Sequence, residues 1–182
     1  KPLVLKVYPD QRSISDELQK YVEELVAMTD KLSMEIVKEN TEEYTPCVRL
    51  FREDDSYTGL AFHGVPGGHE FTSFVLGLYN AAGPGQAIDA ETKRIISKIQ
   101  NPVDMKILVT LSCSMCPDLV TAAQRIAAES SVISAEVYDI HHFPELKSKF
   151  NVMSVPCLII NDQHVLFGKK KLSELADMLS GL

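Results

Sequence analysis

The alternation of hydrophobic and polar residues predicts four strands and two helices in the first half of the chain. Residues 3–8 and 31–40 alternate with the period of a strand, and two shorter stretches between turns, 45–51 and 60–64, are also expected to be strands. Ser15 and Asp16 are expected to cap the first helix, and residues 67–82 are expected to form the second. Four apolar residues of this second helix are expected to face inward: Phe71, Phe74, Val75 and Leu78. The predicted order is strand, helix, strand, strand, strand, helix.

The second half repeats this order, with one additional helix. Strands are predicted at residues 104–112, 132–140, 155–161 and 163–168. Helices are predicted from the cysteine pair to about Ala128, at 143–151 and at 170–182. Residues 88–100 have the spacing of an amphipathic helix between the halves, and Asn101-Pro102 ends it.

Two short segments of the first half match segments of the second. TPCVRLF at 45–51 corresponds to VPCLIIN at 155–161, and LAFHG at 60–64 corresponds to HVLFG at 164–168. We interpret the match as an internal duplication of one α/β unit. The predicted organisation is a first unit at 1–85, a linker helix at 86–103 and a second unit at 104–182, each unit a central mixed sheet flanked by helices.

The composition limits the classes of partner. The 182 residues carry a formal net charge of −7, which argues against nucleic acid as the main partner. No stretch reaches the roughly 20 apolar residues of a membrane span, so no membrane partner is expected and a cytoplasmic location is predicted. Four cysteines are too few for a disulfide-stapled secreted domain, and two of them form the motif C-x-x-C at Cys113 and Cys116.

The position of the C-x-x-C motif favours redox chemistry. It follows a predicted strand and opens a predicted helix, which we expect to begin at or just after Cys113. Free N–H groups at a helix start favour a thiolate, so Cys113 is the expected attacking thiol. Cys116 lies one turn further on and is the expected resolving thiol, more buried than Cys113.

Two alternatives to redox chemistry exist for this motif: zinc binding and a pair of inert buried thiols. Zinc would need two further ligands, for which the sequence offers no second C-x-x-C motif.

A proline supports the redox interpretation. Pro156 stands at the start of a predicted strand, where proline is disfavoured unless the strand is at an edge or the peptide bond is cis. A cis proline there would present backbone groups to an extended segment of a partner. A simple strand-start proline remains equally compatible with the local sequence.

The second half resembles a thioredoxin-fold domain, and the whole chain resembles the N-terminal domain of the flavoprotein subunit of bacterial alkyl hydroperoxide reductase. GHEFTSFVLGL at 68–78, LSCSMCPDLV at 111–120 and FNVMSVPCLIIN at 150–161 carry the resemblance. It implies two fused thioredoxin-like units, the active pair only in the second, and a cis peptide bond before Pro156. The inner dipeptide Ser114-Met115 departs from the His-Asn of relatives, which leaves the reduction potential open.

The resemblance also implies a function. Such domains carry electrons from a flavin-dependent disulfide reductase to a peroxiredoxin, so FAD and NAD(P)H are expected in the reductase and no cofactor in this chain. Glu70 is either a carboxylate that complements a helix dipole or a group that enters the dithiol site and moves protons. His69 is expected at the surface or in a capping position. Cys157 and Cys47 are expected to be core thiols, and by pseudo-symmetry Pro46 is a second candidate cis proline.

Two other functions remain open from the sequence. One is a glutaredoxin-like or general protein-disulfide oxidoreductase, and the other is a partner-docking module whose thiols only regulate contact. These functions differ in whether loss of Cys113 abolishes disulfide turnover.

Overall fold

A computed structural model describes residues 1–39 and 41–182 of the chain. Its eight strands form one mixed sheet in the order β2-β1-β3-β4-β6-β5-β7-β8. The strands are β1 Leu3–Tyr8, β2 Leu32–Ile36, β3 Cys47–Arg52, β4 Tyr57–His63, β5 Val103–Val109, β6 Ile133–Asp139, β7 Cys157–Ile160 and β8 His164–Phe167. The helices are α1 Ser13–Val26, α2 Glu70–Ala82, α3 Ala90–Ser97, α4 Cys116–Glu129, α5 Pro144–Lys149 and α6 Leu172–Ser180.

The sheet contains the same strand arrangement twice. In the first half β1 pairs parallel with β2 and antiparallel with β3, which pairs antiparallel with β4. In the second half β5 pairs parallel with β6 and antiparallel with β7, which pairs antiparallel with β8. The parallel pair β4–β6 joins the two halves into one continuous sheet. The structure therefore shows the duplication that the matching segments predict.

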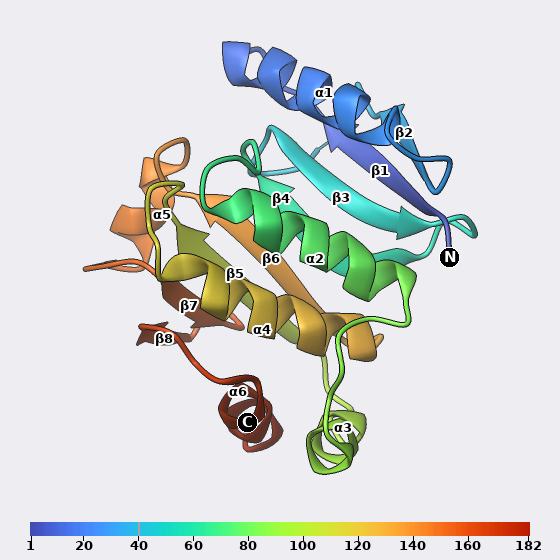
Figure 1. Ribbon diagram of the computed structural model, residues 1–182. Helices are drawn as coiled ribbons and strands as arrows, with labels where there is room; N and C mark the ends of the chain where they lie inside the picture. Colours follow the sequence, from blue (N-terminus) through green and yellow to red (C-terminus); the bar gives the residue numbers. More distant parts are fainter. Residues whose placement is uncertain (40) are drawn as a thin grey trace.

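Helices cover one face of this sheet. Figure 1 shows α2 of the first half and α4 of the second half side by side across it. Side chains that alternate along the strands, such as Ile107 and Leu158, form a large core with these helices. The intervening side chains, such as Leu108 and Cys157, form a smaller core on the opposite face, where α5 packs. Among the described residues, no helix is long and apolar enough to cross a membrane.

Two expectations about the first half are wrong. Helix α1 begins at Ser13 rather than at a Ser15-Asp16 cap, because the Ser15 hydroxyl accepts the Asp10 N–H and is buried inside the first turn. Strand β2 ends at Ile36, well before residue 40, which lies outside the described residues.

The buried face of α2 also differs from the expectation. Phe74 and Leu78 are buried as predicted, but Phe71 and Val75 are exposed. The face that packs on the sheet and on α4 contains the small and polar residues Glu70, Ser73 and Gly77. Gly77 gives the two helices a close approach, because a Cβ atom at this position would lie 2.9 Å from Gln124 Oε1 of α4 and that side chain would have to move. The hydrophobic spacing alone therefore identifies only part of the buried face of this helix.

A largely buried network of charged side chains lies across the junction between the halves. Glu136 of β6 lies 2.7 Å from His63 Nε2 of β4 and accepts a hydrogen bond from Arg49 Nη1 of β3 at 3.0 Å. The Tyr44 carbonyl lies 2.6 Å from the other ring nitrogen of His63. Burial alone would raise the pKa of Glu136, but His63 and Arg49 lower it to about 2. These contacts connect three strands from both halves on the face opposite α2 and α4.

Candidate active site

The cysteine pair lies where β5 leads into α4: Cys113 is in the connecting turn, and Cys116 is the first residue of the helix. Cys113 donates its N–H to the Thr110 carbonyl at 3.1 Å, and the helix begins only at Cys116. The expectation that the helix begins at or just after Cys113 is therefore wrong. Pro117 explains the later start, because proline has no N–H to donate inside a helix and is tolerated in the first turn.

The two thiols differ in exposure as predicted. Cys113 is half-buried, whereas Cys116 is fully buried. They form a disulfide, and their Cα atoms are 5.6 Å apart. The Cys116 N–H, one of the free donors at the start of α4, points at Cys113 Sγ at 3.1 Å. This donor favours negative charge on Cys113 and marks it as the better nucleophile of the reduced pair.

A cis proline lies beside the turn that holds the cysteines. Cys157, the first residue of β7, is paired with Leu108 near the end of β5, and Pro156 immediately precedes it. The Val155–Pro156 peptide bond is cis, as predicted. The Thr45–Pro46 bond at the matching position of the first half is also cis. The same backbone feature thus occurs in both halves, but only the second half combines it with a cysteine pair.

The glycine-rich segment before α2 packs directly against the cysteine turn. The His69 N–H donates to the Leu111 carbonyl at 2.9 Å, two residues before Cys113. Gly68 has a φ of +53°, and a Cβ atom there would lie 2.6 Å from the same carbonyl. Only glycine fits this position without moving the turn. The His69 side chain is exposed, as expected.

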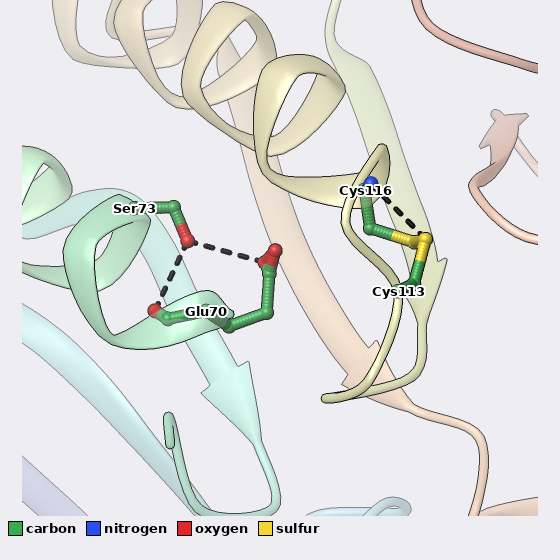
Figure 2. The surroundings of a disulfide bond; sticks show 4 residues. All are labelled: Glu70, Ser73, Cys113 and Cys116. Atoms are coloured by element: carbon green, nitrogen blue, oxygen red, sulfur yellow. Dashed lines mark hydrogen bonds between the residues drawn. A yellow bond between two sulfur atoms is a disulfide. The ribbon is translucent and has the colours of Figure 1, made fainter. Parts of the chain in front are cut away.

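Glu70 reaches the site from the first half of the chain. Figure 2 shows its side chain extending from the start of α2 toward the turn with the disulfide. The residue is fully buried, and Oε2 accepts a hydrogen bond from the Ser73 hydroxyl at 3.1 Å. Oε1 has no hydrogen-bond partner among the described residues. Burial raises the pKa of Glu70 from 4.5 to about 7, although the Ser73 hydroxyl acts in the opposite direction.

The other two cysteines are core thiols, as expected. Cys157 and Cys47 are both fully buried and free. Burial raises the pKa of Cys157 to about 11 and that of Cys47 to about 12, so neither forms a thiolate readily at neutral pH. Among the described residues, no group of three His, Cys, Asp or Glu side chains is placed to hold a metal ion.

Known proteins resemble the chain in fold and in sequence. The family model of the thioredoxin domain matches residues 103–180. The solved NTD_N/C domain of alkylhydroperoxide reductase AhpF from Enterococcus faecalis is 34% identical, with a TM-score of 0.93, over 98% of this chain and 91% of that chain. A Bacillus subtilis protein named NADH dehydrogenase is 33% identical over 98% of this chain and 35% of its own. The F subunit of alkyl hydroperoxide reductase in Pseudomonas aeruginosa is 29% identical over 90% of this chain and 30% of its own. The chain thus spans about a third of the length of these curated relatives.

Fold, disulfide and relatives define the class of the protein. Two fused thioredoxin-like units with one cysteine pair at a strand-to-helix turn make the chain a thiol–disulfide redox module of the oxidoreductase class. Within that class, the chain belongs to the family of the N-terminal domain of the alkyl hydroperoxide reductase protein AhpF.

Proposed function

We propose that the chain is an electron-relay module, which passes electrons from a flavin-dependent disulfide reductase to a peroxiredoxin-type peroxidase. The observation that carries the proposal is the Cys113–Cys116 disulfide, with one half-buried and one fully buried thiol, within the fold of the AhpF N-terminal domain. The reductase is attached to this chain or separate from it, and it holds the FAD and oxidises the NAD(P)H. No cofactor is assigned to this chain.

The relay proceeds by two thiol–disulfide exchanges. The Cys113 thiolate attacks the disulfide of the oxidised peroxidase, which forms a mixed disulfide and releases one peroxidase thiolate. The Cys116 thiolate then attacks Cys113 Sγ, which releases the second peroxidase thiolate and closes the Cys113–Cys116 disulfide. Two electrons have passed to the peroxidase, and the reductase returns two electrons to the cysteine pair.

Two neighbouring residues support these steps in the proposal. Cys116 is buried and must lose its proton before it can attack, and Glu70 has a pKa near neutrality beside the same turn. Glu70 is therefore the proposed proton acceptor. Pro156 is proposed to present the backbone of Val155 to an extended segment of the partner.

The relay is tested by reconstitution. A mixture of the chain, a flavin-dependent disulfide reductase, a peroxiredoxin and a hydroperoxide should consume NAD(P)H, and the rate should be proportional to the concentration of the chain. The same mixture without peroxiredoxin should consume none beyond the first turnover. A chain that reduces insulin or glutathione disulfide as fast as the peroxiredoxin would instead be a general disulfide oxidoreductase.

The Glu70→Gln variant tests the proton-transfer role. It should slow release of a thiol from the mixed disulfide at pH 7 by about tenfold or more, and the inflection near pH 7 in the wild-type profile of rate against pH should disappear.

Glu70 should also make stability depend on pH. Because burial raises the pKa of Glu70 in the folded state, the free energy of unfolding of the wild type should fall as the pH rises from 4.5 to about 7. Glu70→Gln should remove this loss and be up to about 3 kcal/mol more stable than wild type at pH 8, measured by urea denaturation.

Glu24 of α1, an exposed carboxylate far along the chain from the cysteine pair, provides the control. Glu24→Gln should leave both the rate and its pH profile unchanged. A Glu70→Gln variant with a wild-type pH profile for thiol release would assign Glu70 a structural role only.

A further inference from the structure

A groove outside the disulfide site runs along the outer side of α4. Its volume is about 690 Å³, and it lies between α4, α2, the segment before α3 and the start of α6. Apolar side chains contributed by all four of these segments line it: Leu76, Ala87, Ala122 and Leu172. The wall formed by α4 begins at Asp118, two residues after Cys116. A chain segment held in this groove would therefore lie beside the redox turn.

One rim of the groove is basic, although the chain as a whole carries a net charge of −7. Lys169, Lys170 and Lys171 all line it. Lys169 Nζ lies 3.9 Å from Asp118 Oδ2, and both side chains are more than half exposed, so this ion pair is weak. No carboxylate within the described part of the chain lies within ion-pair distance of Lys170 or Lys171.

The remaining charged groups of the groove do not neutralise this rim. Arg125 is buried and is already bound to the Gln86 carbonyl at 2.7 Å and to Glu129 at 3.0 Å. Glu174 lies on α6 and accepts the Lys171 N–H with Oε2 at 3.4 Å. Since Glu129 already pairs with Arg125, the balance is Asp118 and Glu174 against three lysines, which leaves the groove an excess of positive charge.

We propose that this groove binds an acidic segment of the redox partner, with carboxylates on Lys170 and Lys171 and an apolar side chain on the apolar lining. The proposal rests on the relay function and adds the docking site to it. An apolar lining favours a peptide over a nucleic acid, and Asp118 and Glu174 disfavour a run of phosphates. Because the net charge of the molecule repels acidic partners elsewhere, such a segment would be directed to this one place beside Cys113.

A reactive peptide tests the docking site together with the chemistry. The probe is a peptide of twelve residues that contains Glu, Ser and two Leu. A cysteine at one end is activated as a pyridyl disulfide. The Cys113 thiolate attacks it and forms a mixed disulfide, and pyridinethione leaves; Cys116 then releases the peptide thiol. The Glu/Leu peptide should react at least about tenfold faster than peptides with Lys for Glu or Ser for Leu. This advantage should disappear in about 0.5 M salt.

Charge reversal locates the effect. Lys169, Lys170 and Lys171 are replaced together by Glu, a change that suits the start of α6 because acidic residues there complement the helix dipole. This triple variant should lose the advantage of the Glu/Leu peptide. A triple variant of exposed lysines elsewhere, with Lys20, Lys31 and Lys98 replaced by Glu, has the same net charge and should keep it.

A neutral small disulfide separates this inference from the proposed function. Dipyridyl disulfide should react equally with wild type and with both triple variants. If that reaction fails in wild type, the relay function fails. Two results with a working dipyridyl disulfide reaction would overturn the docking site. One is that the Glu/Leu peptide reacts no faster than the control peptides. The other is that it still reacts faster in the variant without Lys169, Lys170 and Lys171. A single-stranded oligonucleotide that competes as well as the Glu/Leu peptide would also overturn the proposal.

Discussion

Replacing Cys113 with Ser should lower the rate of protein-disulfide reduction at least roughly a thousandfold, because the attacking group is removed. Cys113 is the half-buried member of the pair, and the Cys116 N–H donates to its Sγ. Cys116 is fully buried and cannot take over the attack. The measurement is the rate at which the prereduced chain reduces an oxidised peroxiredoxin in a single turnover. The released peroxiredoxin thiols report this rate.

Cys157→Ala is the matched control for this substitution. Cys157 follows the cis proline, but it is buried, and burial raises its pKa to about 11. Its loss should lower the free energy of unfolding and leave the exchange rate within about twofold of wild type. A Cys113→Ser variant that keeps a tenth of the activity, or a Cys157→Ala variant that loses it, would contradict the assignment.

Replacing Glu136 with Ala should lower the free energy of unfolding by about 2–3 kcal/mol, because Arg49 would keep only one of its two carboxylate partners, Glu42 at 2.8 Å. Glu136 lies 2.7 Å from His63 Nε2, and this contact would be lost as well. The effect should depend on pH in a defined direction. Because the network lowers the pKa of Glu136 from 4.5 to about 2, its contribution should be complete above about pH 5 and decline as the pH falls toward 2. Urea denaturation across this pH range measures the effect.

Glu35→Ala provides a surface control for the same loss of charge. The Glu35 carboxylate is about half exposed and lies 3.9 Å from Lys6 Nζ, so its removal should cost less than about 1 kcal/mol. A Glu136→Ala variant no less stable than Glu35→Ala would show that the network does not hold the halves together.

The sequence predicts the fold well because the hydrophobic pattern of each strand and the matching segments of the two halves can both be seen in short stretches of residues. Alternation marks strands such as β1, β5 and β6, short apolar runs between turns mark β4 and β7, and the matching segments around Cys47 and Cys157 predict the duplication. Helix boundaries and faces are predicted less well where long-range contacts decide them. Phe71 and Val75 are exposed because α4 packs against the side of α2 that contains Gly77. The hydrophobic spacing does not report that α2 also packs through small and polar residues such as Ser73 and Gly77.

The candidate site is only partly contained in the motif. The spacing of Cys113 and Cys116 predicts their chemistry and their difference in burial, and the resemblance identifies the cis proline. The sequence leaves Glu70 open between a carboxylate at a helix start and a group that enters the dithiol site, because its burial depends on the contact of the first half with the turn of the second. The network around Glu136 is also missed, although charged residues in the middle of apolar strands such as β3 and β6 are a signal that could have located it.

The Cys116→Ser variant tests the central claim most directly. Without the resolving thiol, the mixed disulfide on Cys113 cannot be released, so the variant should retain its partners covalently in cells exposed to a hydroperoxide. The relay predicts that the captured proteins are a peroxiredoxin and a flavin-dependent disulfide reductase, that dithiothreitol releases them, and that a variant with both Cys113 and Cys116 replaced by Ser captures neither. Capture of glutathione or of unrelated proteins alone would contradict the relay.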